Sequence, residues 1–171
     1  MSTAHAFDIS QVDDFLASEK ALEDAMPIWQ SSSRPGELHA IWNISDPLGV
    51  RAHLRFRISE TEPTLPSVSL IFRRNAVARL DIEDPTVSHS NPPWAAQLGL
   101  PAEVSGSHFH SWEDNRDHIL NTGLWELPAR RPVEAALRRV PQMLPWIADR
   151  LGITITHEQR AFDLPPKEQL L

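Results

Sequence analysis

The segment VRAHLRFRIS, residues 50–59, restricts the fold of this chain more than any other stretch. Its side chains alternate: Ala52, Leu54, Phe56 and Ile58 fall on one side, and Arg51, His53, Arg55 and Arg57 fall on the other. Strict alternation has the period of a β-strand with one buried face and one solvated face. Such a strand belongs in a sheet that leaves one face open to water, and antiparallel sheets tolerate this arrangement.

Four further runs alternate in the same way, at residues 37–45, 67–73, 76–83 and 107–112. The short RNA segment at residues 74–76 is typical of a hairpin turn between two of these runs. Residues 10–27 and 132–151 have apolar side chains at helical spacing, and we predict helices there. Within the second, Pro141 and Pro145 predict a kink or two short helices, and Gly152 predicts the end.

These elements predict an α+β fold. We expect an antiparallel sheet of about five strands, with the amino-terminal helix and the carboxy-terminal helical region covering one face. Residues 1–156 are expected to form a single domain, and residues 157–171 an extended or disordered tail. The chain of 171 residues is long enough to bury a core without disulfides.

Composition narrows the classes of function. Cysteine is absent, which excludes thiol nucleophiles and thiolate metal sites. The net charge of −7 argues against a protein that coats nucleic acid by charge alone. The first residues, MSTAHAFDIS, do not have the pattern of a signal peptide, and no run of ~18 apolar residues occurs. We therefore expect a cytoplasmic protein without a membrane segment.

The open face of the predicted sheet carries the candidate site. Arg55 and Arg57 fall on it from one strand, and Arg79 and Asp81 from another. The stretch SGSHFHSW, residues 105–112, adds His108 and His110, and the proline-rich loop of residues 84–105 carries His89. If these strands are neighbours, an acidic protein has a cationic, histidine-bearing groove. Solvated side chains that do no chemistry explain the same pattern for individual arginines.

Three kinds of chemistry suit this face. Metal-free phosphodiester cleavage uses one histidine to accept the proton of a ribose 2′-hydroxyl, a second to protonate the leaving oxygen, and arginines to hold the phosphate. A metal site is a second option, with Asp81, His89 or His118 completing the two imidazoles, although no full metal motif is present. The third option is a binding surface built on tryptophans such as Trp94 and Trp112.

The order of the motifs resembles a known family. An Arg-x-Asp on a strand, a His followed by Asn-Pro, and a His-x-His occur within residues 68–115, where they correspond to Arg79, Asp81, His89, His108 and His110. This order resembles TumE-like toxins of bacterial toxin–antitoxin modules and related bacterial and prophage proteins. The long loop between His89 and His108, the added helices and the net acidity depart from that pattern. The resemblance implies a toxin-like domain directed at nucleic acid.

Our leading hypothesis is a ribonuclease-toxin-like protein with a metal-free site and no cofactor. In it His108 and His110 are the acid and base candidates, His89 closes over the site, and Asp81 orients Arg79 or a histidine. Arg79 is the phosphate ligand, with Arg55 and Arg57 assisting. The expected partner is RNA, or a protein such as an antitoxin or host factor, and a homodimer is an option. The alternative is a non-enzymatic binding protein, such as a phage-encoded inhibitor of a host defence system.

Overall fold

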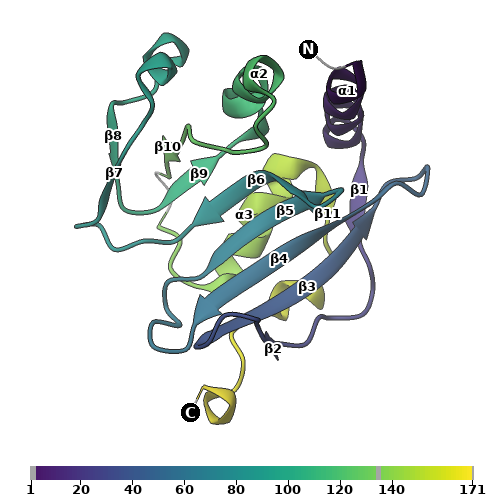
Figure 1. The fold of residues 1–171 in the computed structure, drawn as a ribbon. Helices are drawn as coiled ribbons and strands as arrows, with labels where there is room; N and C mark the ends of the chain where they lie inside the picture. Colours follow the sequence, from purple (N-terminus) through teal and green to yellow (C-terminus); the bar gives the residue numbers. More distant parts are fainter. Residues whose placement is uncertain (1–2, 134–135, 171) are drawn as a thin grey trace.

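The computed structural model describes residues 3–133 and 136–170, and its centre is one large, mostly antiparallel sheet (Figure 1). The strands follow the order β10-β9-β6-β5-β4-β3-β1-β11, and β2 pairs with β3. Their bounds are β1 (Lys20–Leu22), β2 (Gln30–Ser31), β3 (Glu37–Ser45), β4 (Arg51–Ser59), β5 (Ser67–Phe72), β6 (Asn75–Asp81), β9 (His108–His110), β10 (Arg131–Pro132) and β11 (Ile153–Thr154). A second, two-stranded sheet pairs β7 (Ser88–Ser90) with β8 (Glu103–Ser105).

The helices are α1 (Thr3–Ala17), α2 (Trp112–Thr122) and α3 (Val140–Leu151). Three short 3-10 helices complete the described residues: η1 (Pro93–Leu98), η2 (Gln159–Ala161) and η3 (Lys167–Gln169).

The predicted α+β class is confirmed. The five runs read as strands from their alternation are β3, β4, β5, β6 and β9, and they lie side by side in that order. The sheet has more strands than the five expected, because β1, β2, β10 and β11 add short pairings. The turn between β5 and β6 is at Arg73 and Arg74, which both have positive φ angles, as the tightest hairpin turns require.

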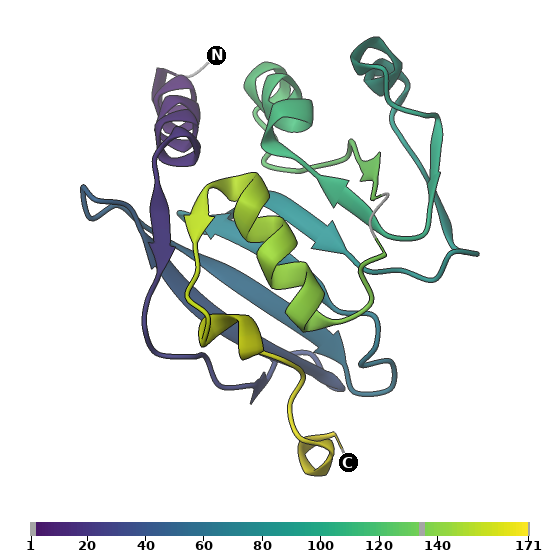
Figure 2. The ribbon, with the colours of Figure 1, turned by 180° about the vertical axis from the view of Figure 1, so that it is seen from behind.

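One face of the sheet packs under α3, as Figure 2 shows from behind. Leu54, Leu70 and Leu80 are fully buried on this face, and Met143, Leu144 and Ile147 of α3 are buried with them. At the β9 edge the ring of Phe109 meets Trp146 edge-on, with 5.2 Å between centroids. This apolar layer is the main core, and the opposite side of the central strands carries most of their polar residues.

The amino-terminal helix differs from the predicted range of 10–27. It ends at Ala17, and Lys20–Leu22 form β1, which pairs with β3 and β11. The Lys20 side chain folds back and donates hydrogen bonds to the carbonyl oxygens of Phe15, Leu16 and Ser18. Those contacts close the end of the helix, and Leu22 then enters the core as a strand residue.

The carboxy-terminal helix begins later than the predicted residue 132. Arg131 and Pro132 pair with β9 as β10, residues 134–135 of the predicted helix lie outside the described residues, and α3 starts at Val140. It is one continuous helix with Pro145 inside it, rather than two short helices. Gly152 adopts the left-handed conformation and ends it, which confirms the predicted stop.

The chain after α3 returns across the sheet. Phe162 is buried and contacts the rings of Trp42 and Phe56, and Gln159 is buried beside it. Within the described residues, no helix combines the length and apolar character needed to cross a membrane.

Candidate functional site

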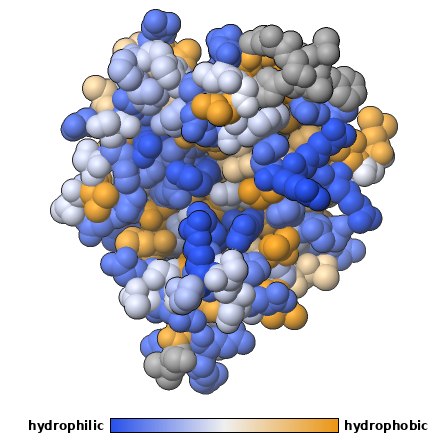
Figure 3. All heavy atoms as spheres, viewed as in Figure 1, coloured by the Kyte–Doolittle hydropathy of each residue, from blue (hydrophilic) through white to orange (hydrophobic). Residues whose placement is uncertain are grey.

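The pairing register of β5, β6 and β9 brings the candidate residues onto one face. Arg79 lies directly opposite His110, and Asp81 lies opposite His108. On the other side of β6, Ser69 and Ser67 separate these two residues from Arg55 and Arg57 of β4. All of these positions share the face opposite α3, as the alternation predicted. Figure 3 views this face, where hydrophilic side chains spread over the central strands.

Both histidines of β9 are held by backbone carbonyls. Nδ1 of His108 lies 2.8 Å from the oxygen of Gly106, and Nδ1 of His110 lies 2.6 Å from the oxygen of Leu127. A carbonyl oxygen only accepts, so each Nδ1 carries a hydrogen and donates it. The Nε2 atom of each ring therefore faces the other residues of the cluster.

Those Nε2 atoms converge on Asp81. Oδ2 of Asp81 is 3.4 Å from Nε2 of His108 and 3.5 Å from Nε2 of His110. Burial acts to raise the pKa of Asp81, but the contacts of its carboxylate with His108 and His110 and the charge of Arg79 outweigh it and hold the pKa well below its usual range. The carboxylate is therefore ionised.

Arg79 links this carboxylate to His110. Its Nε donates to Oδ2 of Asp81 over 2.7 Å, and a terminal nitrogen lies 3.0 Å from Nε2 of His110. Guanidinium nitrogens only donate, so Nε2 of His110 accepts and the ring is neutral. Burial lowers the pKa of His110, which agrees with this state. With both nitrogens engaged and no exposed surface, His110 is a fixed support for Arg79.

His89 reaches the cluster from outside the main sheet. The long loop predicted at residues 84–105 contains the β7–β8 hairpin and η1, and β7 carries His89. The ring of His89 meets that of His108, with 5.0 Å between centroids. Its Nε2 is 2.9 Å from a carboxylate oxygen of Glu83. The His89 side chain is 35% exposed, whereas that of His108 is 2% exposed, so His89 is the imidazole that solvent reaches.

Sequence reasoning missed two residues of the cluster. Glu83 continues the alternation of Arg79 and Asp81, and that signal could have identified it. Arg130 lies in an irregular segment that has no such pattern. Its Nε is buried without a hydrogen-bond partner among the described residues. Burial, followed by the nearby charge of Arg79, lowers the pKa of Arg130, and Asp81 and Glu83 act on it in the opposite direction.

Two asparagines hold the segment that carries Arg130. Asn115 of α2 is fully buried and exchanges hydrogen bonds with the backbone of Ala129. Asn91 exchanges hydrogen bonds with the backbone of Arg130 and also reaches the carbonyl of Pro101. The segment after α2 therefore returns to β9. Its Leu127 carbonyl bonds His110, and this packing explains why the two histidines of β9 are buried rather than open to water.

Arg55 and Arg57 share the face but stand apart from the cluster. They lie on β4, so a full strand, β5, separates them from Arg79 and Asp81. At ~4.8 Å between neighbouring strands, Arg55 and Arg79 originate about 10 Å apart. Nε of Arg55 is buried and has no hydrogen-bond partner in the described part of the chain.

The cluster also contains two sets of metal-ligating groups. Asp81, His108 and His110 form one set, and Glu83, His89 and His108 form the other, with the ligand atoms in each set within 4.8 Å of one another. His108 is common to both sets. The arrangement thus offers proton-transferring, anion-binding and metal-binding chemistry within a few ångströms.

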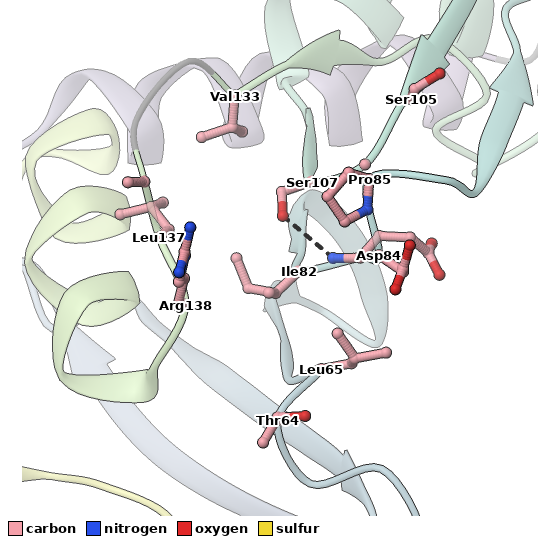
Figure 4. Close-up of a pocket in the computed structure, with 13 residues that line it drawn as sticks. Thr64, Leu65, Ile82, Asp84, Pro85, Ser105, Ser107, Val133, Leu137 and Arg138 are labelled. Atoms are coloured by element: carbon pink, nitrogen blue, oxygen red, sulfur yellow. Dashed lines mark hydrogen bonds between the residues drawn. The ribbon is translucent and has the colours of Figure 1, made fainter.

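A pocket of about 610 Å³ lies beside the cluster, at the end of β6 (Figure 4). Its apolar wall includes Leu65, Ile82 and Val133, and Leu137 faces them from the other side. Glu83, which bonds His89, also lines this pocket, and the backbone N–H of Glu83 donates to Oγ of Ser107. Glu83 is therefore shared between the cluster and the pocket.

Comparison of the chain with family models, with curated proteins and with solved structures gives no match.

Proposed function

We propose that this protein is a cytoplasmic ribonuclease of the TumE-like toxin kind, which cleaves RNA at a metal-free histidine–arginine site. The observation that carries the proposal is the joint placement of Arg79, Asp81 and His108 by the β6–β9 register, with His89 and Glu83 against them. Two imidazoles, an ionised carboxylate and a guanidinium are the groups that phosphodiester cleavage needs.

His89 is the proposed general base. When its Nε2–H donates to Glu83, Nδ1 keeps a lone pair that accepts a proton. His89 is also the most exposed histidine of the cluster, so a ribose 2′-hydroxyl can approach it. Glu83 fixes the ring and stabilises the imidazolium that forms, as the carboxylate of a catalytic triad does.

His108 is the proposed general acid, and His110 is a positioning residue. In the reaction the ribose 2′-oxygen attacks the adjacent phosphorus, and the bond from phosphorus to the 5′-oxygen breaks. The proton of the 2′-hydroxyl passes to His89, and the Nε2 proton of protonated His108 passes to the departing 5′-oxygen. The products are a 2′,3′-cyclic phosphate and a free 5′-hydroxyl, so atoms and charge balance without a metal ion.

Arginines supply the charge that holds the phosphate. Arg79 is already oriented by Asp81 and His110, and Arg130 faces the same charges with an Nε that has no hydrogen-bond partner among the described residues. Planar guanidinium groups bind two phosphate oxygens and stabilise the charge that develops on them. Arg55 and Arg57 are placed to bind a neighbouring phosphate on the same strand of RNA.

A cleavage assay on a broad RNA panel, run with chelator, tests the proposal. We expect His89→Gln to lower the cleavage rate about 100-fold or more, the range for loss of a general base. Arg79→Met should lower it by a similar factor. His157→Gln is the matched control, because His157 is exposed and far along the chain from the cluster. Its rate should equal that of the wild-type protein.

Growth measurements give an independent readout. Induced wild-type protein should stop growth of a bacterial host, and His89→Gln should not, at equal protein level. A co-expressed antitoxin from a neighbouring gene should restore growth. Intact RNA across the panel, together with growth arrest that is unchanged in His89→Gln, would overturn the proposal.

One observation favours the alternative, a non-enzymatic binding protein such as an inhibitor of a host defence system. Large apolar side chains are exposed on one part of the described chain, residues 26–50: Met26, Ile28, Ile41, Leu48 and Val50. Where exposed apolar residues form a contiguous patch, they mark an interaction surface. Under this alternative, Ile28→Asp or Leu48→Asp abolishes a stable complex with the partner, while His89→Gln leaves that complex intact.

A further inference from the structure

The Nε2 atoms of His108 and His110 and the Oδ2 atom of Asp81 form a compact set of electron-pair donors. Both imidazoles have their hydrogen fixed on Nδ1 by a carbonyl oxygen. A neutral His108 thus presents a lone pair to an ionised carboxylate. Only a proton or another cation between the two makes that arrangement favourable. For His110 that cation is the guanidinium of Arg79.

The separations match those around a transition metal. Zinc lies ~2.0–2.1 Å from imidazole nitrogen and from carboxylate oxygen, so two ligands at the tetrahedral angle are about 3.3 Å apart. Oδ2 of Asp81 is 3.4 Å from Nε2 of His108 and 3.5 Å from Nε2 of His110. The carbonyls that fix each Nδ1–H are the outer contacts that metal-bound histidines usually have. Three protein ligands leave a fourth position open.

We propose that Asp81, His108 and His110 bind one divalent transition metal ion of the zinc class, in competition with the side chain of Arg79. Nε of Arg79 is hydrogen-bonded to Oδ2 of Asp81, and a terminal nitrogen of Arg79 is hydrogen-bonded to Nε2 of His110. These are two of the three atoms that the ion requires. The Arg79 side chain is 36% exposed, so it can leave the cluster toward solvent when the ion binds.

Metal binding at this site is independent of the proposed reaction, but its effect on activity rests on that reaction. The ion engages Nε2 of His108, which then has no proton to give to a leaving oxygen. It also displaces Arg79 from its contacts with Asp81 and His110. Zinc therefore inhibits RNA cleavage, and a chelator restores it.

Zinc titration against a chromophoric chelator measures the binding directly, using full-length, untagged protein. We expect one ion per chain, with affinity lowered about tenfold or more in His108→Gln. The distinguishing variant is Arg79→Met, in which loss of the competing guanidinium should tighten binding about tenfold. Arg57→Met, on the same face but one strand beyond β5, should bind like the wild-type protein. Circular dichroism confirms that each variant is folded.

The absorption spectrum of the cobalt-substituted protein reports the ligands independently. Intense visible bands indicate a coordination number of four or five, and they should be lost in Asp81→Asn. No zinc binding at micromolar concentration would overturn the metal site, and equal affinity in Arg79→Met and wild type would overturn its competition with Arg79. Zinc binding without inhibition of an active ribonuclease overturns only the regulatory effect. An inactive protein that still binds zinc with this pattern contradicts the proposed function and supports the metal site.

Discussion

His108 lies directly opposite Asp81 in the antiparallel pairing of β6 with β9, and its Nε2 is 3.4 Å from Oδ2 of the carboxylate. Two positions along the same register, Arg79 lies opposite His110. Two residue pairs of one strand pair, separated by the Leu80–Phe109 pair on the opposite face, therefore build the centre of the cluster. Because both strands are part of the main sheet, the side chains are positioned by the fold itself.

Asp81→Asn tests how strongly this carboxylate holds the cluster together. The amide keeps the shape but loses the charge that Arg79, His108 and His110 surround. We expect the free energy of unfolding to fall by about 2 kcal/mol, the range for hydrogen bonds to a charged group. Urea denaturation measures it, and Asp24→Asn, at an exposed position, is the control. Equal stability of the two variants would mean that Asp81 contributes no net stabilisation.

Gly106→Ala tests the turn that presents a carbonyl to His108. Gly106 has φ +74°, and an added Cβ would lie 3.2 Å from Cα of Pro85. We expect a loss of about 1 kcal/mol or more in the free energy of unfolding, with reduced cleavage because the Gly106 carbonyl shifts. Gly49→Ala is the control, since Gly49 has φ +78° and open space around its Cβ position. If Gly106→Ala and Gly49→Ala lost the same free energy of unfolding, the contact with Pro85 would have no cost.

Arg74→Gly is expected to stabilise the protein. Arg74 has φ +74° in the β5–β6 turn, a conformation that costs a residue with a side chain about 1 kcal/mol relative to glycine. Thermal unfolding should therefore shift upward. The same change at Arg51, an exposed residue in a strand with ordinary backbone angles, should lower stability. A downward shift for Arg74→Gly would mean that its side chain contributes more than the turn costs.

Lys20 makes the free energy of unfolding depend on pH in the alkaline range. Burial lowers the pKa of Lys20 to about 8, and the charge of Asp46 acts against that change. An unfolded lysine keeps its proton up to about pH 10.4. Between these values the unfolded state binds more protons, so the free energy of unfolding rises as pH rises.

The chain offers a clean background for measuring this effect. It contains no tyrosine or cysteine, and its only other lysine is the exposed Lys167. Urea denaturation at pH 7.5 and 9.5 should show increasing stability for the wild-type protein and a weaker dependence for Lys20→Met. The Lys167→Met control should follow the wild-type curve. A pH dependence that survives in Lys20→Met would assign it to another group.

The sequence predicted the centre of the site because it depends on two regular patterns. Alternation placed Arg79 with Asp81 on one strand face and His108 with His110 on another. The pairing of β6 with β9 then brings the two sets together. The end of α1 was not predictable from its apolar spacing, because Leu22 suits a helix and a strand equally. The Lys20 side chain, which bonds three carbonyls at the end of α1, decides between them only in three dimensions.

The remaining parts of the site depend on contacts between distant segments. Arg130 reaches the cluster because Asn91 bonds the backbone of Arg130 itself and Asn115 bonds the backbone of Ala129, the preceding residue. The carbonyls of Gly106 and Leu127 that orient the histidines are backbone groups with no signature in side-chain identity. Burial of His108 and His110 follows from the same return of the chain after α2.

The chemical form of the RNA ends tests the central claim most directly. Mass spectrometry of the fragments, with chelator present, should find a 2′,3′-cyclic phosphate on one fragment and a 5′-hydroxyl on the other. A single 2′-deoxynucleotide at the cleavage position should block that cut. Cleavage that tolerates the 2′-deoxynucleotide, or that leaves a 5′-phosphate, would contradict attack by the 2′-oxygen and with it the metal-free histidine mechanism.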